Sequence, residues 1–511
     1  MYSLLTALHT LQNIARENPK KLLTLCAAVF FGWILAIPFD GLIVRELFNR
    51  QGIHIPSISL VLMGAHLVGL LTGAWLVKNL RQAWQAMMMT VVLCLGASFV
   101  LFLPLSVAGY PALLLMAYCS GIFVTAFGQP LQEMIPSSQR FTTVVDVLIF
   151  SNLLMIAIDV VTVAWHIIPG KILALLLLII AMAGLIVLGP AFASLETVEK
   201  RKDSFIKNDK TAAPPSLLRP FAWLCLFIIL ITLNSGVMYQ VVTPTFAHLP
   251  LLTSFYWAIP YIAALVLLRT MPKKANRSNT LYVALAMMGL GYLFYGLLPA
   301  NAASFLLIYT LMLGALGVFD MFWWSLMASF LDYSKRPAMI LGVGLASNVF
   351  GIFLGGFAGN TLHNMPEGKS EISLAAFGVI FVGLALLPVV NRELTRVFQY
   401  HIFLVGGVQP DSPLTLPESV PESHGLEKAK EVVEEDVTDP VMQLREEYQL
   451  TDREWEIIGY LRKGYTYRAI GKALGITEHT IKFHTRNIYQ KMDVQNKMDL
   501  VKKLAEEQDE G

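Results

Sequence analysis

The sequence predicts an all-α protein in which a bundle of twelve transmembrane helices precedes a small cytoplasmic domain of four helices. Three observations support this fold class. The mean hydropathy of the 511 residues is +0.59, and 55% of them are hydrophobic, which is typical of chains that span a membrane. Apolar runs of about 20 residues recur throughout residues 21–396. Near the C-terminus the apolar spacing changes to that of soluble amphipathic helices.

The first 20 residues predict a short amphipathic helix on the cytoplasmic surface of the membrane. Apolar side chains recur there at helical spacing, at Leu4, Leu5, Leu8, Leu11 and Ile14. Basic residues then precede the first long apolar run. Residues 1–20 are therefore assigned to a cytoplasmic N-terminus and not to a membrane span.

Residues 21–396 form the predicted membrane domain. Each apolar run in it has about the length that a helix needs to cross a bilayer. The predicted spans are 22–44, 57–77, 86–107, 110–131, 142–165, 171–193, 220–242, 250–269, 280–298, 302–328, 338–360 and 372–390.

The distribution of basic residues gives the orientation of these spans. With the N-terminus inside, the cytoplasmic segments hold 20 Lys and Arg residues and the outer segments hold 4. Cytoplasmic loops of membrane proteins carry such an excess. The chain is therefore predicted to be a multi-pass protein of the cell membrane with both termini in the cytoplasm. The longest loop, 194–219, is basic and separates the sixth span from the seventh.

An internal repeat supports a division into two halves of six helices. "SQRFTTVVDVLIFSN" (138–152) opens the fifth span, and "SKRPAMILGVGLASN" (334–348) opens the eleventh. The two stretches share Ser-x-Arg at one end and Ser-Asn at the other, at equivalent places in their halves. This pattern is typical of a duplicated transporter-type fold.

A flexible acidic linker is predicted at residues 397–446. Four prolines lie between Pro410 and Pro421, and residues 405–449 contain 11 acidic and 3 basic residues. Such a composition does not bury a core.

The last 60 residues predict a helix-turn-helix. Thr451 is a good N-cap and Glu454 follows three residues later, which is a capping box. A second helix near 467–474 ends at Gly475, and the turn "GIT" leads into a third helix with Thr477 as its N-cap. A fourth helix is predicted near 497–506.

A family pattern runs through this stretch. It opens with Leu-Thr-x-Arg-Glu over 450–454 and continues with an Ile and a small residue at 470–471. The turn and third helix read Leu-x-Ile-Thr-x-x-Thr-Ile-Lys-x-His over 474–484, and Ile488, Lys491, Met492 and Val494 extend the match. With these residues, 450–501 resembles the LuxR-type helix-turn-helix domain, although Gly471 replaces the usual Ala and Lys497 a frequent Arg. The resemblance implies a domain over residues 447–506 that binds double-stranded DNA as a homodimer.

The resemblance also implies which side chains meet DNA. Lys482, Phe483 and Arg486 are predicted at base edges in the major groove, where Arg486 can bond guanine O6 and N7. The predicted phosphate contacts are Thr477, His479, Thr480 and Lys491. Residues 450–504 hold 11 basic and 6 acidic residues, which favours DNA binding over the alternative of a solvated helix in a protein-binding bundle.

The membrane domain resembles the major facilitator architecture through its two halves of six helices. That family carries Gly-x-x-x-Asp-Arg-x-Gly-Arg after the second helix, and here "GAWLVKNLR" (73–81) retains Gly73, Lys78 and Arg81. Val77 replaces the Asp and Leu80 the second Gly. Because those two residues support gating in active transporters, their replacement favours a sensor over a transporter.

Ionisable residues within apolar spans indicate a functional site. The predicted ligand-binding residues are Asp40, Asp146, Asp159 and Asp320, with Trp323 and Trp324 as an aromatic wall for a flat or cationic ligand. For each Asp the alternative is a hydrogen bond between helices, and Asp40 lies close enough to the outer surface to be solvated. The sequence contains no metal-ligand spacing and no pairing of a nucleophile with a base. We therefore expect no metal, no cofactor and no enzyme activity.

These features predict a membrane-embedded, one-component transcription regulator from a bacterium. In this hypothesis the membrane domain senses an unknown small molecule, because the chain has no soluble α/β segment that could serve as a phosphorylatable receiver. One alternative is an active major-facilitator-type transporter with a regulatory DNA-binding tail. Another is a DNA tether without ligand response.

Overall fold

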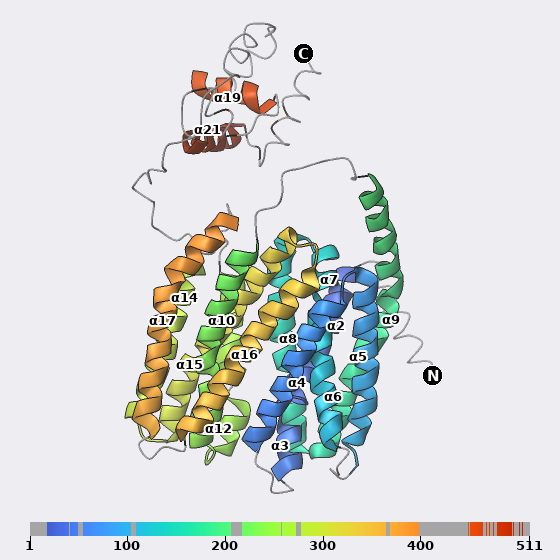
Figure 1. Ribbon diagram of the computed structural model, residues 1–511, viewed down its shortest axis with the longest axis vertical. Coiled ribbons are helices and arrows are strands. Elements are labelled where there is room, and N and C mark those ends of the chain that lie inside the picture. The colour runs from blue at the N-terminus through green and yellow to red at the C-terminus, as the bar shows by residue number, and fades with distance from the viewer. Residues whose placement is uncertain are drawn as a thin grey trace. The chain divides into compact units, whose positions relative to one another are not determined.

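The computed structural model divides into two compact units, Met1–Gln409 and Pro410–Gly511, which are described separately (Figure 1). The residues that the structure describes are 18–39, 41–49, 55–103, 109–205, 217–256, 258–271, 277–363, 368–397, 448, 450–462, 467, 470, 474, 478–492, 494, 500 and 503. The predicted N-terminal helix lies outside them, except for its last residues. The predicted linker also lies outside them, apart from residue 397.

Twelve helical segments in the described part of the first unit are long and apolar enough to cross a membrane, as the sequence predicts. The first six are α2 (Pro19–Ala36), α4 (Ile55–Leu76), α5 (Leu80–Val100), α6 with α7 (Gly109–Ala126, Gly128–Glu133), α8 (Ser137–Ala164) and α9 (Ile167–Phe205). The short helix α3 (Leu42–Asn49) follows α2. We call these helices the first half.

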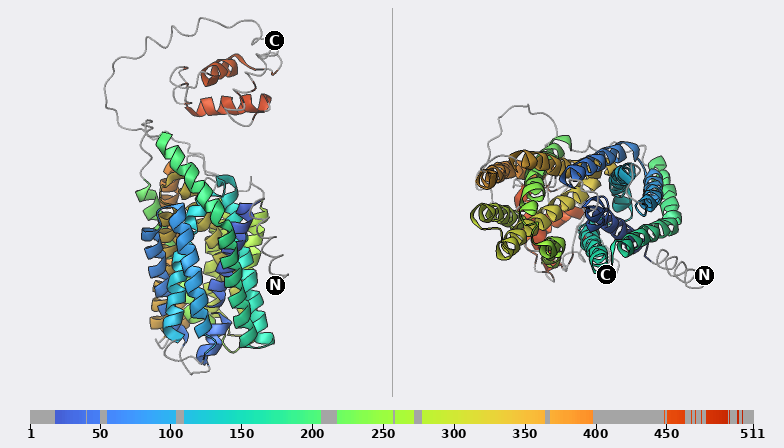
Figure 2. Two further views of the ribbon diagram at one scale, coloured as in Figure 1. Left: turned by 90° about the vertical axis from the view of Figure 1, so that its right-hand side faces the viewer. Right: turned by 90° about the horizontal axis from the view of Figure 1, so that it is seen from below.

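The second half contains the last six spans. These are α10 with η1 and α11 (Leu218–Val237, Met238–Val242, Thr243–Thr245), α12 with α13 (Pro250–Phe255, Ala258–Thr270), α14 (Arg277–Leu297), α15 with η2 (Ala302–Phe330, Leu331–Tyr333), α16 (Pro337–His363) and α17 (Gly368–Val397). Seen along the bundle, the two halves form two groups of helices side by side (Figure 2).

Several helices differ from their predicted bounds, among them α2, which ends at Ala36 and not at 44, and α17, which continues to Val397. Two of the differences have clear local reasons. The third span begins at Leu80, six residues before the predicted 86, because the Asn79 side chain accepts a hydrogen bond from the Gln82 N–H at 2.9 Å and caps the helix there. The sixth span continues to Phe205, so the first part of the predicted loop 194–219 is helical. The residues after 191 are mostly good helix formers and include no glycine or proline before Phe205.

The halves meet mainly where α4 packs on α16 and where α8 packs on α13 and α15. Gly342 permits one of these close approaches. A Cβ atom at Gly342 would lie 2.6 Å from the Ala74 Cβ, so any larger residue would push α16 away from α4.

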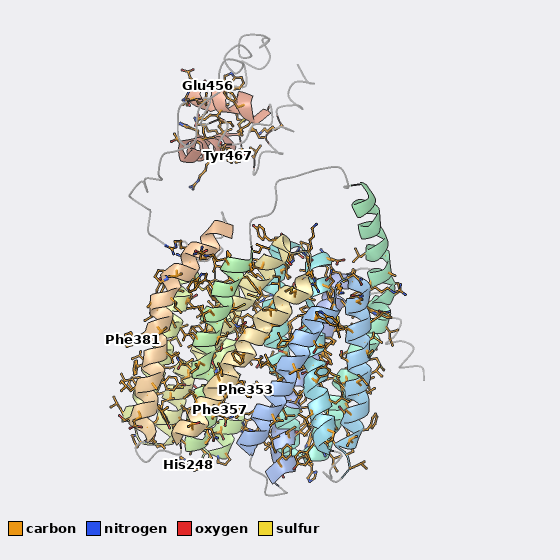
Figure 3. All side chains as sticks on the ribbon, viewed as in Figure 1. His248, Phe353, Phe357, Phe381, Glu456 and Tyr467 are labelled. Carbon is orange, nitrogen blue, oxygen red and sulfur yellow. The ribbon has the colours of Figure 1, made fainter. Side chains whose placement is uncertain are left out.

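The surface of the first unit is apolar along its length. Phe381 on α17 and Phe357 on α16 are both 64% exposed, and Figure 3 shows them on the outside of the bundle. Such extensive apolar exposure is unfavourable in water but is satisfied by lipid chains. The unit is therefore a multi-pass membrane bundle.

The second unit has its own core. Its two long described helices are α19 (Asp452–Arg462) and α21 (Glu478–Lys491), with helical residues Tyr467, Ile470 and Leu474 between them. The fully buried core side chains are Ile457, Leu461, Ile470, Ile481, Ile488, Met492 and Leu500. These apolar residues recur at helical spacing and belong to a cluster separate from that of the membrane bundle.

Candidate functional site

The start of α19 is fixed by the predicted capping box. The Thr451 N–H donates to Glu454 Oε2 at 2.9 Å, and the Glu454 N–H donates to Thr451 Oγ1 at 3.3 Å. The two side chains thus satisfy each other's free backbone N–H group, which confirms the capping box.

Two further contacts of this segment hold other helices of the unit. Arg453 Nη2 donates to the Leu474 carbonyl at 2.7 Å, immediately before the predicted turn, and Lys491 Nζ donates to Glu454 Oε2 at 2.7 Å. Lys491 is the last residue of α21, so Glu454 joins the end of that helix to the beginning of α19. The opening motif therefore fixes the position of α21.

Burial and hydrogen bonding act in opposite directions on the pKa of Glu454. Burial alone would raise this pKa, but the hydrogen bond from Lys491, the two from Thr451 and the Lys491 charge together lower it below its ordinary value. The carboxylate is consequently ionised at neutral pH, as its contact with Lys491 requires.

Helix α21 has a buried and an exposed side. Ile481, Thr485 and Ile488 are buried at helical spacing, whereas Arg486 is exposed. The hydroxyl of Thr485 donates to the Ile481 carbonyl at 2.8 Å and so needs no other partner. The helix can therefore present Arg486 to a partner without disturbing the core.

The predicted aspartates of the membrane unit lie at different levels. Asp146 and Asp159 both belong to α8 and are 13 residues apart in the sequence, which corresponds to about 20 Å along a helix. They cannot contact one small ligand together. Asp40 lies outside the described residues.

Asp146 forms an ion pair between the halves. Arg269 of α13 donates through Nε to Asp146 Oδ1 at 2.5 Å and through Nη2 to Oδ2 at 3.2 Å. The two side chains are 26% and 43% exposed. This two-bond geometry is specific, and it occupies the carboxylate that the sequence assigned to a ligand.

Asp159 lies near the other end of α8. It is 4% exposed, its carboxylate is close to the backbone of Leu42 and the charge of Arg45, and its Oδ1 has no hydrogen-bond partner. Asp159 thus associates with α3, within the first half.

Asp320 lies in the interior of α15 and accepts two hydrogen bonds. Tyr261 of α13 donates its hydroxyl to Oδ2 at 2.7 Å, and Trp323 donates Nε1–H to Oδ1 at 3.1 Å. Gly317, one turn earlier on α15, allows this contact: a Cβ there would lie 2.8 Å from the Tyr261 carbonyl oxygen. We call Tyr261, Asp320 and Trp323 the Asp320 cluster.

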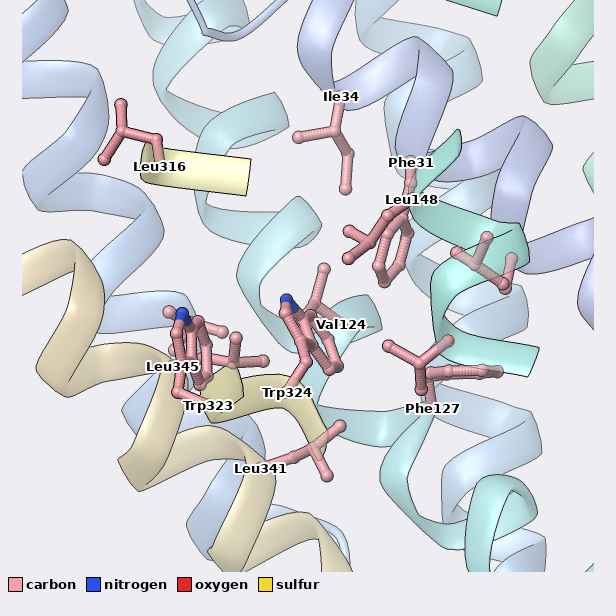
Figure 4. Packing of buried hydrophobic residues seen from close by; sticks show 14 of the residues in the cluster. Phe31, Ile34, Val124, Phe127, Leu148, Leu316, Trp323, Trp324, Leu341 and Leu345 are labelled. Atoms are coloured by element: carbon pink, nitrogen blue, oxygen red, sulfur yellow. The ribbon is translucent and has the colours of Figure 1, made fainter. Parts of the chain in front are cut away.

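Trp323 of this cluster and the adjacent Trp324 are both buried. The rings of Trp323 and Trp324 stack with centroids 5.4 Å apart, and Trp324 lies 6.3 Å from the ring of Phe31 in the first half. Figure 4 shows Trp324 directed toward Phe31, Val124, Phe127 and Leu148. The aromatic wall that the sequence predicts is therefore also a contact between the halves.

Arg140 is a functional candidate that the sequence analysis did not select. Its guanidinium donates to Asp332 Oδ1 at 2.5 Å and to the Ala328 carbonyl, both in the second half. Within the first half it donates to three backbone carbonyls beside the end of α7, those of Leu131, Gln132 and Ile135. Its side chain is 7% exposed. Gln132 adds hydrogen bonds to the carbonyls of Leu331 and Ser334.

Polar contacts between the halves thus gather near the beginning of α8. We call Gln132, Arg140, Asp146, Arg269 and Asp332 the inter-half latch. The repeated Ser-x-Arg was a usable signal, because Arg140 and its counterpart Arg336 open equivalent helices and each reaches the other half. Arg336 does so weakly, through a 3.5 Å bond to the Trp75 carbonyl. No sequence signal indicated Tyr261 or Asp332.

Comparison with known families addresses the second unit first. Residues 448–504 match the family GerE, bacterial regulatory proteins of the luxR family. These residues form a LuxR-type DNA-binding domain. The match covers the capping box, the core and α21.

Solved structures resemble the membrane unit. The human organic anion transporter MFSD10 (TETRAN) is 13% identical, with a TM-score of 0.52 over 71% of this chain and 97% of that chain. The peptide transporter POT is 14% identical, with a TM-score of 0.49 over 76% and 95% of the two chains. The first likeness gives the membrane unit the major facilitator fold, as predicted. The family match and the twelve apolar helices together show that the chain is a membrane protein with a DNA-binding regulatory domain.

Most of the predicted DNA-contacting side chains of the LuxR-type domain lie outside the described ones. Lys482, Phe483 and His479 belong to α21, but only their backbone is described, and Thr477 lies outside the described residues. Thr480 is half-buried and Arg486 exposed. Lys491, predicted to contact phosphate, bonds Glu454 instead in this structure. In the described part of the chain, no group of three or more His, Cys, Asp or Glu residues could hold a metal ion.

Proposed function

We propose that this protein is a membrane-embedded, one-component transcription regulator that senses a small molecule. The observation that carries the proposal is the joining of a LuxR-type DNA-binding domain and a major facilitator bundle in one chain. A DNA-binding domain anchored in this way needs an input, and the membrane bundle is the large unit available to provide it. The protein is bacterial in this proposal, since the matching family is one of bacterial regulatory proteins. It lies in the cell membrane. Both termini are in the cytoplasm, because the basic residues concentrate in the loops on the same side as the termini.

The LuxR-type domain reads DNA with the N-terminal part of α21 in this proposal. Lys482, Phe483 and Arg486 face base edges, while Thr477, His479 and Thr480 bind phosphates and set the register. The exposure of Arg486 opposite the buried face of α21 supports its role. The sequence predicts Lys491 as a phosphate contact, but its bond to Glu454 favours a positioning role.

The domain acts as a homodimer on DNA, through its last helix. Leu500 of that segment is fully buried in the core of the unit and is therefore not available for the dimer contact. We assign the dimer contact to Met498, Val501 and Leu504, the other apolar residues of that segment, which lie outside the described residues.

The inter-half latch couples ligand to output in this proposal. It joins the two halves at the end of the bundle where α8 begins, which is the cytoplasmic end in the proposed orientation. A ligand that binds better to one arrangement of the halves shifts the population between latched and unlatched states. The unlatched state changes the position or dimerisation of the LuxR-type domain.

The test is a transcript profile together with chromatin occupancy of the full chain. We expect a small set of promoters to be occupied and regulated, and Arg486→Ala to weaken both signals at normal protein levels by relaxing the base preference. The matched control is Glu456→Gln, an exposed position of α19 in the same domain whose ion pair with Arg453 is on the surface. Occupancy that does not change with Arg486→Ala would contradict the proposed DNA contact.

Transport is the second proposed function, favoured by the likeness of the membrane unit to an organic anion transporter in fold. Uptake into proteoliposomes distinguishes the two functions. Accumulation driven by an ion gradient would support a transporter whose tail regulates transcription. Ligand binding without accumulation supports a sensor.

A further inference from the structure

The carboxyl group of Asp320 has no counter-ion among the residues that the structure describes. Its recorded contacts are the hydroxyl of Tyr261 and the indole N–H of Trp323, both uncharged donors. No Lys, Arg or His in the described part of the chain forms an ion pair with it. Asp146 differs, because Arg269 neutralises it at 2.5 Å. An unpaired carboxylate within a membrane bundle is unfavourable unless a cation or a proton joins it.

We infer that the Asp320 cluster is the binding point for a small organic cation with an aromatic or other apolar body. This inference rests on the proposed sensing function and names the class of ligand that the membrane unit takes. The single carboxylate matches one positive charge, and the surrounding rings match an apolar body.

The aromatic residues near Asp320 support a cation over other ligands. Tyr261 and Trp323 direct their hydrogen-bond donors at the carboxylate, and Tyr239 of η1 lies close enough to Tyr261 to interact with it electrostatically. Tyrosine and tryptophan rings attract ammonium groups through their π faces, as in known sites for quaternary ammonium ligands. An anionic ligand would meet the Asp320 charge without compensation.

The surroundings favour an organic cation over a metal ion. A hard cation such as Ca²⁺ takes six to eight oxygen ligands, among them carboxylates. Asp320 supplies one carboxylate, and the described residues include no group of three His, Cys, Asp or Glu side chains that could bind a metal. The cluster can therefore neutralise a charged nitrogen without replacing a complete hydration shell.

The position of Asp320 connects this site to the rest of the bundle. Asp320 is half-buried, with Tyr261 of α13 and the Trp323 ring against its carboxyl group. Trp324, one turn further along α15, contacts Phe31 of the first half, and Asp332 of the latch follows at the end of the same span. A cation held at Asp320 is thus on the helix that carries both inter-half contacts.

The test uses the full-length protein in detergent and a matched pair of ligands. Phenyltrimethylammonium carries a permanent charge, and tert-butylbenzene is its neutral isostere. Binding is followed by the shift of the thermal unfolding midpoint and by quenching of tryptophan fluorescence. The variants are Asp320→Asn, Asp320→Glu, which keeps the charge, and Glu371→Gln as a control on the exposed first turn of α17.

We expect saturable binding of the cation to the wild type and to Glu371→Gln, and binding at least about tenfold weaker to Asp320→Asn. Asp320→Glu should retain part of the affinity. The neutral isostere should bind the wild type and Asp320→Asn alike. Equal binding of the cation to wild type and Asp320→Asn overturns the inference, and so does the absence of saturable binding to the wild type. A variant that does not fold would lose both ligands. Unchanged binding of the neutral isostere therefore shows that weaker binding of the cation results from the lost charge.

A parallel measurement separates this inference from the proposed function. If the cation binds at Asp320 but leaves promoter output unchanged, the site stands and the sensing role fails. If promoter output responds to a neutral or anionic molecule and the cation does not bind, the regulator stands and the cation site fails.

Discussion

The LuxR-type domain and the membrane unit stabilise their polar groups over very different sequence distances. In the domain, Thr451 and Glu454 are three residues apart and cap their own helix. In the membrane unit, Arg140 and Asp332 are separated by 192 positions, and Asp146 and Arg269 by 123. The first kind of contact can be recognised from a short motif. The contacts between the halves depend on how the two halves fold together. A conformational change that moves one half against the other can break them.

The largest effect is expected from removing the buried guanidinium that joins the two halves. Arg140→Ala leaves Asp332 without its partner and several carbonyls without a donor in a buried place, so we expect a loss of about 3 kcal/mol in stability of the latched state. The measurement is the thermal unfolding midpoint of the full-length protein in detergent, together with promoter output.

The matched variant is Arg140→Lys, which keeps the charge but cannot reproduce the planar set of donors. It should fall between wild type and Arg140→Ala. If Arg140→Ala unfolds at the wild-type temperature, the latch does not stabilise the bundle.

Removal of Glu454 tests the short-range counterpart. Glu454→Ala eliminates half of the capping box and the bond from Lys491, and should destabilise the LuxR-type domain by about 2 kcal/mol. Chemical denaturation followed by the near-ultraviolet signal of the domain measures it, with residues 410–511 as the compact unit to examine.

The pH dependence of the same residue sharpens this prediction. The pKa of Glu454 is lower in the folded than in the unfolded state, so the unfolded chain binds the proton more readily. Its contribution to stability is therefore present above the unfolded value of about 4.3 and is lost as the pH falls through the folded pKa. Glu454→Gln should flatten the acid limb of the stability curve. An unchanged acid limb would contradict the role of the ionised carboxylate.

DNA affinity distinguishes Arg486 from Lys491, two of the basic residues of α21. Arg486→Ala should relax base preference at one position by about 1–3 kcal/mol and leave the fold intact. Lys491→Ala should lower the stability of the domain while leaving the salt dependence of DNA binding nearly unchanged, because Lys491 bonds Glu454. Binding measured at several salt concentrations decides this. A decrease of about one unit in the salt slope for Lys491→Ala would return this residue to phosphate binding.

The smallest effect is expected at the exposed part of the latch. Asp146→Asn removes an ion pair whose side chains are 26% and 43% exposed, so the loss should be below about 1 kcal/mol. High salt should weaken the wild-type contact to a similar extent. If Asp146→Asn destabilised the protein as much as Arg140→Ala, the two contacts would have to form a single cooperative network.

The sequence alone predicted the number of spans, the two-half architecture and the LuxR-type domain. Hydropathy within single segments predicts the spans, and the repeat between 138–152 and 334–348 indicates the two halves. The LuxR-type domain is recognisable from a contiguous motif that includes the capping box. The membrane site was harder. The sequence selected Asp146 as a ligand residue because it lies in an apolar span, but its partner Arg269 becomes apparent only when α8 and α13 are packed together. Tyr261 carries no local pattern that relates it to Asp320.

The bounds of the helices show the same limit on a smaller scale. The sixth span was predicted to end at 193 because hydropathy falls there, yet α9 continues as a helix to Phe205. Hydropathy reports the lipid-exposed part of a helix, whereas helix propensity and caps determine where the helix ends. Asn79 is a cap of this kind that could have been recognised from the sequence.

The most direct test of the account measures whether the inter-half latch controls DNA binding. Full-length protein in lipid nanodiscs is titrated with a DNA sequence selected by the wild-type protein, and Arg140→Ala is titrated in parallel under the same salt. The account predicts that opening the latch changes operator affinity or its dimer cooperativity, while residues 410–511 alone bind the same sequence without that difference. Identical operator binding by wild type and Arg140→Ala, in nanodiscs and in promoter output, would contradict it.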